Sequence, residues 1–416
     1  MLDLTKLARQ MQGIGQHLSQ EAILARQRLD LAQNLLEQAR TRQPDLVTQQ
    51  QTWGDRLGFT AAQPLEPLDT RINLTPAPSL HTVIATDGSQ IAPSHHEIAY
   101  CYLINVGRVV LHYGQNRHPL LDSLPEIVYR PEDLYISRQW GIRTEEWMGY
   151  RRTVSEAVTL AELGRREAGG GKREAGSGRR EAGSGKADLD LSDPFVPTLA
   201  MVDGSLLHWF LEPLPGEARD RILPPMLAAW DQLRANRIPL VGYLSAARSG
   251  EALNFLRLHT CPFLAPDCAT HCSGQTDQAP CQVFAPLRDT ALWGLLLEPG
   301  QRGAIWRSSA KILEVYGEHT VCFCYVNVGA EIARVEFPLW VMEDETLLNA
   351  ALSLTLTQVQ KGYGYPVALA EAHNQAVVRG GDRARFFALL EQQMIRAGLK
   401  NIGTSYKEAR KRGSIA

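Results

Sequence analysis

The chain has 416 residues, of which 44% are hydrophobic and 21% charged, and its formal net charge is −2. This composition is typical of a globular protein with enough length for a sizeable core or two domains. The near-neutral charge excludes a polycation, so any nucleic-acid binding would depend on a local basic groove. No apolar run approaches the roughly 20 residues of a membrane-spanning helix, and the N-terminus lacks an apolar signal core. We therefore expect a cytoplasmic protein with no membrane partner.

The first 40 residues carry apolar side chains at helical spacing. This pattern predicts a helical arm that packs on the core or on a second copy of the chain. A Pro-containing stretch at 64–78 follows, and the strand pattern starts after it. We therefore predict an N-terminal helical arm and linker at 1–78 and a main domain at 79–416.

The main domain begins with a β pattern. The sequence HTVIATDGS (81–89) predicts a strand that ends at Asp87, and residues 97–114 predict a hairpin that turns near Val106 and Gly107. Residues 144–163 lack Pro and predict a helix. The repeats REAGGGK, REAGSGR and REAGSGK follow within residues 164–192. Their Gly and Ser content predicts a flexible, low-complexity insert.

The second half alternates between strand and helix patterns. Within residues 196–211 we predict a buried strand that ends at Asp203. A helix at 218–236 follows, and then a strand that leads into a loop at 238–248. Residues 319–329 and 332–341 predict paired strands, and the remaining C-terminal segments predict helices. This order predicts an α/β fold with a mixed sheet flanked by helices.

Two Asp-Gly-Ser sequences, which contain Asp87 and Asp203, follow apolar runs. Asp-Gly is a turn signal, so two hairpin turns are one interpretation. Side by side at a sheet edge, the two carboxylates would instead give hard oxygen ligands for Mn²⁺ or Mg²⁺. Two such ions would activate water for attack on a phosphodiester.

A metal site of this kind needs further ligands. The predicted helix at 144–163 offers acids at four positions: Glu145, Glu146, Glu156 and Glu162. The C-terminal region offers His373. A lone His on a helix is more often a surface or capping residue than a ligand.

Four cysteines lie close together in the sequence, within the predicted Cys-rich insertion at 259–283: Cys261, Cys268, Cys272 and Cys281. Their spacing differs from the two CxxC pairs of a zinc ribbon. Four thiolates can nevertheless hold Zn²⁺ or an iron–sulfur cluster, and reduced surface cysteines are the alternative. We expect a structural metal here, with zinc favoured, in an insertion that contacts DNA or a partner.

The order of several motifs resembles the NurA family. These motifs are DGS after an early strand, RRTVSE in a helix, then VDGSLL, LVGYLS, ARVEFPLW and YPVALAEAHNQAVV. The resemblance extends from about residue 80 onward. It implies an RNase H-like core and a Mn²⁺-dependent DNA nuclease that acts in DNA end resection and repair. It also implies a hexameric HerA-type, FtsK-like ATPase as partner, and a homodimer whose central channel admits DNA.

The same resemblance implies the site residues. Asp87 and Asp203 match the family's first and second metal-binding Asp, and Glu156 matches its helix acid. Glu146 is a rival for that role, because the repeats disturb the spacing to Asp203. His373 falls where the family places its last metal-site residue, which can be an Asp in other members.

We therefore predict a metal-dependent DNA nuclease in which metal-activated water attacks the phosphodiester. A non-catalytic adaptor that docks on a ring ATPase is one alternative. A metal-dependent RNase or structure-specific resolvase is another, because the acids bind metal whichever sugar the substrate contains.

Overall fold

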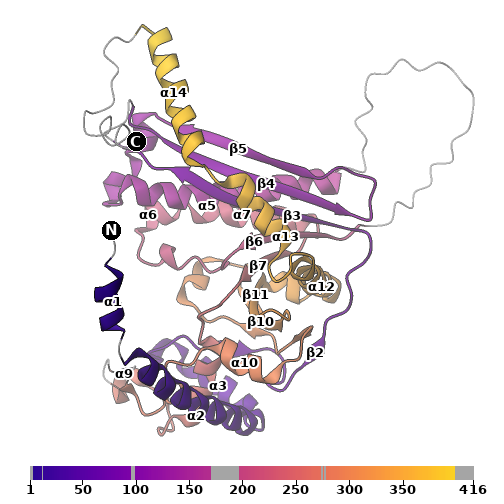
Figure 1. The fold of residues 1–416 in the computed structure, drawn as a ribbon. Helices are drawn as coiled ribbons and strands as arrows, with labels where there is room; N and C mark the ends of the chain where they lie inside the picture. The colour runs from indigo at the N-terminus through magenta and orange to yellow at the C-terminus, as the bar shows by residue number, and fades with distance from the viewer. Residues whose placement is uncertain are drawn as a thin grey trace, which may run out of the picture. The chain divides into compact units, whose positions relative to one another are not determined.

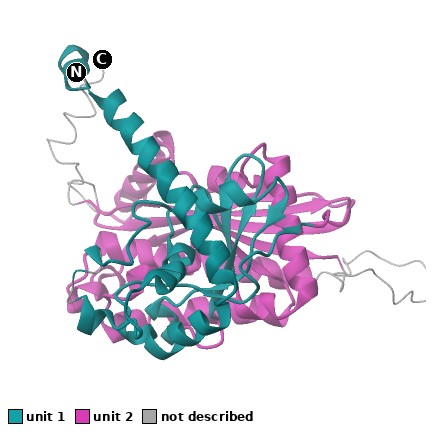
Figure 2. Ribbon diagram, turned by 90° about the horizontal axis from the view of Figure 1, so that it is seen from below, with its two compact units in different colours: residues 1–74, 243–314, 320–337 teal, residues 75–242, 315–319, 338–416 magenta. Residues whose placement is uncertain are grey.

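The computed structural model describes residues 3–11, 13–94, 99–169, 196–272, 275 and 278–398. Their contacts divide the chain into two compact units (Figure 2). Unit 1 comprises 1–74, 243–314 and 320–337, and unit 2 comprises 75–242, 315–319 and 338–416. The units group segments by contact, so the sequence-based division at residue 78 remains a prediction. Among the described residues, we find no helix with both the length and the apolar character to cross a membrane.

Unit 2 is built on a mixed sheet with the order β7-β6-β3-β4-β5. Its strands are β3 (His81–Ile91), β4 (Tyr102–Tyr113), β5 (Leu120–Val128), β6 (Thr198–Asp203) and β7 (Leu240–Leu244), the last two residues of β7 being counted to unit 1. β3, β4 and β5 pair antiparallel, whereas β6 pairs parallel to β3. This arrangement confirms the predicted mixed sheet.

Two predictions about these strands are wrong. β3 continues through Asp87 to Ile91, and β4 passes through Val106 and Gly107 without a turn. Gly107 pairs with Asp87 in the antiparallel ladder. Its missing side chain serves helix packing instead of a turn, because a Cβ there would lie 2.3 Å from the Ala372 carbonyl oxygen.

Helices cover the sheet of unit 2 (Figure 1). α5 (Thr144–Gly169) packs against β3, β4 and α7 (Leu223–Ala235), and α13 (Val367–Ala376) packs against β3 and β4. α5 contacts β3 at Thr86 and Gly88, whereas α13 contacts it at Asp87 and Ser89. Since neighbouring strand residues point to opposite faces, the two helices lie on opposite sides of the sheet.

The remaining helical elements of unit 2 are mostly short: α4 (Pro131–Leu134), η2 (Ile136–Trp140), η3 (Trp209–Leu211), α6 (Gly216–Arg219), α11 (Leu339–Met342), α12 (Glu345–Lys361) and α14 (Gly380–Arg396). α5 extends to Gly169, beyond the predicted start of the insert at 164. The rest of the predicted insert, up to residue 192, lies outside the described residues.

Unit 1 combines the N-terminal helices with a second group of strands in the order β1-β9-β10-β11, in which β8 pairs with both β2 and β10. Its helical elements are α1 (Leu4–Gln10), α2 (Ile14–Arg40), α3 (Gln43–Trp53), η1 (Gly54–Arg56), α8 (Glu251–Thr260), α9 (Cys268–His271), α10 (Asp289–Leu296) and η5 (Lys311–Val315). Its strands are β1 (Gln63–Pro64), β2 (Ile72–Asn73), β8 (Gln301–Arg302), β9 (Trp306–Arg307), β10 (Val321–Asn327) and β11 (Ile332–Pro338). Phe255, Trp293, Trp306 and Tyr325 lie in its core.

We predict that Gly107→Ala destabilises the protein by about 1–3 kcal/mol, because the added methyl group would overlap the backbone of α13. That group would meet the Ala372 carbonyl oxygen at 2.3 Å and the Ala376 nitrogen at 2.5 Å. Gly149→Ala in α5 is the matched control, since nothing lies within 4 Å of its added Cβ, and Ala favours helix by up to about 1 kcal/mol. Denaturant unfolding measures both variants. Equal stabilities of the two variants would contradict the close packing of α13 on β4.

Candidate metal centre

The parallel pairing of β3 and β6 brings the two Asp-Gly-Ser sequences together. The last pair in the ladder is Thr86 with Val202, so Asp87 and Asp203 occupy the next position on adjacent strands. Asp203 ends β6, and Gly204 adopts a φ of 100°, which favours glycine and turns the chain away. The turn interpretation is wrong for Asp87, which lies inside β3.

α5 brings Glu156 to the same place. The Thr86 hydroxyl donates to the Glu156 carbonyl oxygen at 3.1 Å, which fixes this turn of the helix against β3. A Cβ at position 88 would lie 2.2 Å from Glu156 Oε1 and 2.6 Å from Arg152 Cγ. The glycine of the first Asp-Gly-Ser therefore makes room for the carboxylate of Glu156.

The structure separates the two rival helix acids. Glu146 precedes Glu156 by ten residues, or about 15 Å along a helix. Its carboxylate is exposed and accepts a hydrogen bond from the Tyr150 hydroxyl at 2.7 Å. Glu156, and not Glu146, lies with the two aspartates.

α13 supplies His373 from the opposite face of the sheet. His373 Nδ1 lies 2.8 Å from Asp87 Oδ2, and the side chain is 66% exposed. The C-terminal end of α13 is fixed because Ser89 Oγ and Asn105 Nδ2 both donate to the Ala376 carbonyl oxygen. All four predicted site residues thus lie in one region of unit 2.

Two further side chains belong to this region. Tyr365 donates a hydrogen bond to Asp203, and Arg152 Nε lies 3.2 Å from Glu156 Oε1. Neither residue is predicted from the sequence as part of the metal site. The four-residue spacing between Arg152 and Glu156 marks an ion pair on a helix, whereas no sequence pattern singles out Tyr365.

The acids form a centre with unbalanced negative charge. Burial raises the pKa of Glu156 to about 7; the Arg152 guanidinium opposes this shift, and the charges of Asp87 and Asp203 add to it. Burial also raises the pKa of Asp203, against the hydrogen bond from Tyr365. Protonation of Glu156 is one way to relieve this repulsion, and binding of a cation is the other.

The donor set fits a hard divalent cation. As the side chains stand, no three His, Cys, Asp or Glu residues in the described part of the chain are arranged to hold an ion together. Oxygen donors from Asp87, Asp203 and Glu156, turned toward one centre, are the ligands that Mg²⁺ and Mn²⁺ prefer. Burial, together with the charges of Asp87 and Asp203, disfavours the ionised form of Glu156, and a cation bound beside it would compensate that charge.

A cleft of about 330 Å³ adjoins the acids. Asp87, Glu156 and Asp203 line one part of it, and the apolar side chains of Met226 and Trp230 line another. Such a volume suits a small organic group, and the polar part fixes its orientation. The site therefore has room for part of a substrate beside the carboxylates.

Comparison with known proteins gives two matches. The family model for the NurA domain matches residues 81–378, and no curated protein matches the chain. Among solved structures, the crystal structure of the NurA nuclease from Sulfolobus solfataricus matches with a TM-score of 0.50 and 12% sequence identity, covering 95% of this chain and 98% of that chain. The family match confirms the resemblance found in the sequence, and the structural match is a likeness of fold.

We predict that Glu156→Gln stabilises the metal-free protein at pH 8. The folded state raises the pKa of Glu156 from 4.5 to about 7, so its stabilising contribution is full below pH 4.5 and is lost as the pH rises through 7. Melting temperature in EDTA should therefore fall from pH 6 to pH 8 more steeply for the wild type than for Glu156→Gln.

Glu146→Gln is the matched control, because it removes an exposed acid from the same helix. It should keep the wild-type pH dependence. A Glu156→Gln variant with the same decline as the wild type would contradict a buried, repelled carboxylate at this position.

Proposed function

The chain belongs to the NurA family, and we propose that it is a metal-dependent nuclease that hydrolyses phosphodiester bonds in DNA. One observation carries this function: Asp87, Asp203 and Glu156 come together from β3, β6 and α5 beside a cleft. The Sulfolobus solfataricus protein with a similar fold is a nuclease, which gives further support.

Asp87, Asp203 and Glu156 would hold the ion, for which we propose Mn²⁺, with Mg²⁺ as the alternative. Bound there, the metal would lower the pKa of a coordinated water and stabilise negative charge on the phosphodiester. His373 belongs to the same set, because its Nδ1 contacts Asp87 and its side chain is largely exposed beside the acids. The contact with His373 orients the carboxylate of Asp87, as the hydrogen bond from Tyr365 orients that of Asp203.

Arg152 has a separate role in this proposal. Its guanidinium pairs with Glu156 while the acids are uncompensated. With the charge of Glu156 compensated by a bound cation, the Arg152 guanidinium would be free to bind phosphate oxygens through paired N–H donors. Arg152 also lines the cleft, so a phosphate there lies within its reach.

We extend the proposal to the biological setting that family membership suggests. The setting is DNA end resection and repair with a HerA-type hexameric ATPase, by an RNase H-like nuclease that acts as a homodimer. Exposed apolar side chains along α1 and the first half of α2 support a partner surface: Leu4, Met11, Ile14, Leu18 and Ile23.

We predict that Leu18→Glu lowers the molecular mass measured by sedimentation from that of a dimer to that of a monomer. Leu18 is 60% exposed, so the change should leave the melting temperature of the protomer nearly unaltered. Leu389→Glu on α14, also 60% exposed, is the matched control. A monomeric wild type, or a dimer that survives Leu18→Glu, would contradict dimerisation through this arm.

We predict that the protein degrades end-labelled linear DNA in Mn²⁺ and that EDTA abolishes cleavage. Asp87→Asn and Asp203→Asn should each reduce the rate at least about 100-fold, because each removes a ligand charge without changing side-chain size. Glu146→Gln should retain the wild-type rate. Circular dichroism confirms that the variants are folded.

The two alternatives give other outcomes. Cleavage of matched RNA with little loss of DNA would indicate an RNase, and cleavage confined to branched DNA would indicate a resolvase. A folded wild type that cleaves nothing in Mn²⁺, with or without a HerA-type ATPase, would favour the non-catalytic adaptor. DNA cleavage that survives both Asp substitutions would overturn the assigned site.

A further inference from the structure

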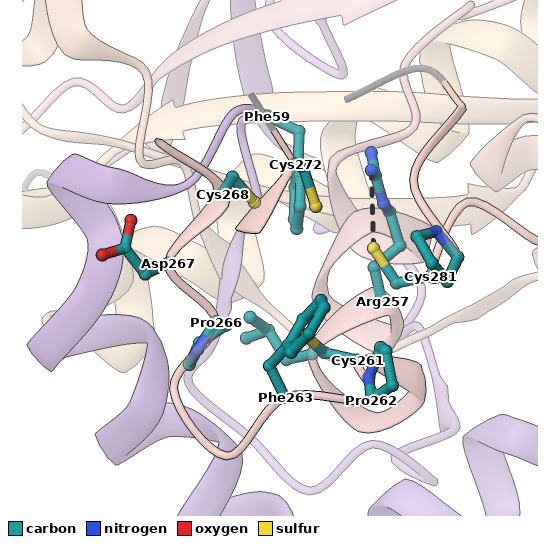
Figure 3. A pocket seen from close by; sticks show the side chains of 12 residues that line it. Phe59, Arg257, Cys261, Pro262, Phe263, Pro266, Asp267, Cys268, Cys272 and Cys281 are labelled. Carbon is teal, nitrogen blue, oxygen red and sulfur yellow. Dashed lines mark hydrogen bonds between the residues drawn. The ribbon is translucent and has the colours of Figure 1, made fainter. Parts of the chain in front are cut away.

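The four clustered cysteines line one small cavity in unit 1 (Figure 3). Cys261 follows α8, Cys268 begins α9, Cys272 follows α9, and Cys281 precedes α10. All four are free thiols. The cavity measures about 10 Å³, which is about the size of one water-sized sphere.

The thiols lie close enough to influence one another. Burial raises the pKa of the Cys261 thiol, and the charges of Cys281 and Cys268 raise it further. Burial likewise raises the pKa of Cys272, and the other three cysteines all add to that shift. Cys268 and Cys272 also share a hydrogen bond. The fold therefore brings the four thiols to one place, although their spacing in the sequence is long and irregular.

A buried cation lies beside this group. The Arg257 side chain is on α8, with the residue only 2% exposed, and its Nη2 donates to Cys281 Sγ at 3.7 Å. Its guanidinium also lies over the Phe59 ring at 3.7 Å (Figure 3). Four thiolates around a divalent ion would carry net negative charge, and the Arg257 guanidinium beside Cys281 would face that charge.

Anchored elements hold two of the cysteines. The N-terminus of α8 is fixed by the buried carboxylate of Asp289, which accepts from the Ala252 and Leu253 nitrogens and from the Tyr325 hydroxyl. Asp267 caps α9 by accepting from the Thr270 nitrogen.

Arg56 Nη2 lies 2.6 Å from Asp267 Oδ2, and this ion pair links the start of α9 to the end of η1. The described part of residues 261–281 otherwise contains little regular structure. Four buried or half-buried thiols in such a segment resemble a loop stabilised by a metal ion.

We propose that Cys261, Cys268, Cys272 and Cys281 bind one Zn²⁺ in a structural site whose negative charge Arg257 offsets. Zinc fits because closed structural sites use four thiolates and a single ion, and the cavity is of single-ion size. In the described part of the chain, these thiols are not arranged around a common centre. Binding of an ion therefore requires their side chains to turn toward one point.

The first test is metal content in protein purified without chelators. The background is Asp87→Asn with Asp203→Asn, which removes two acids of the other candidate site. We expect about one zinc per chain by mass spectrometry, and a large loss of zinc in Cys268→Ser with Cys272→Ser. Cys101→Ala is the matched control, because Cys101 is a buried thiol of unit 2 and its loss should leave zinc unchanged.

The second test needs no cysteine variant. Replacing the bound metal with Co²⁺ should give the strong thiolate charge-transfer absorption and visible bands of a tetrahedral four-sulfur site. Absence of these bands, zinc that survives the serine substitutions, or iron with acid-labile sulfide would each overturn a zinc site. Because the background lacks two acids of the other candidate site, failure here is distinguishable from failure of the nuclease.

Discussion

The central constraint on unit 2 is that its fold places three carboxylates close together, although their charges repel one another. The parallel register of β3 and β6 places Asp87 and Asp203 at adjacent positions, and α5 adds Glu156. Two like charges 4 Å apart repel by about 4 kcal/mol at the effective dielectric typical of a protein surface. The fold must therefore hold the acids together against their charges. Burial is the main cause of the raised pKa of Glu156, and the charges of Asp87 and Asp203 add to it. Groups arranged at such a cost to stability are a common mark of functional sites.

Two glycines let the helices approach closely enough to supply the rest of the site. Gly88 admits Glu156 and Arg152 from α5, and Gly107 admits the backbone of α13, which carries His373. Both glycines are neighbours of Asp87. Gly88 follows it on β3, and Gly107 pairs with it from β4. The site thus depends as much on missing side chains as on the acids themselves, and larger residues at either position would move a helix that carries a site residue.

The mixed sheet and the proximity of Asp87 and Asp203 could be predicted from the sequence. The order of strand and helix patterns indicates the sheet, and an Asp directly after an apolar run marks the end of a buried strand. It did not predict that β3 continues past Asp87, because Asp-Gly favours a turn unless a neighbouring strand holds the chain extended. Gly107 was misinterpreted for the same reason, since close contact with α13 cannot be read from local sequence. The choice between Glu146 and Glu156 depends on which turn of α5 faces Gly88, and only the packed structure shows this. Tyr365 and Arg257 carry no sequence signal for the partners they contact.

The most direct measurement is anomalous X-ray scattering from crystals soaked in Mn²⁺. The account predicts a manganese peak within coordination distance of carboxylate oxygens of Asp87 and Asp203, with the Glu156 side chain turned toward it. The Arg152 guanidinium should then be released from Glu156. A peak elsewhere in the molecule, or none at this position in crystals of the active protein, would contradict a metal centre built from these three acids.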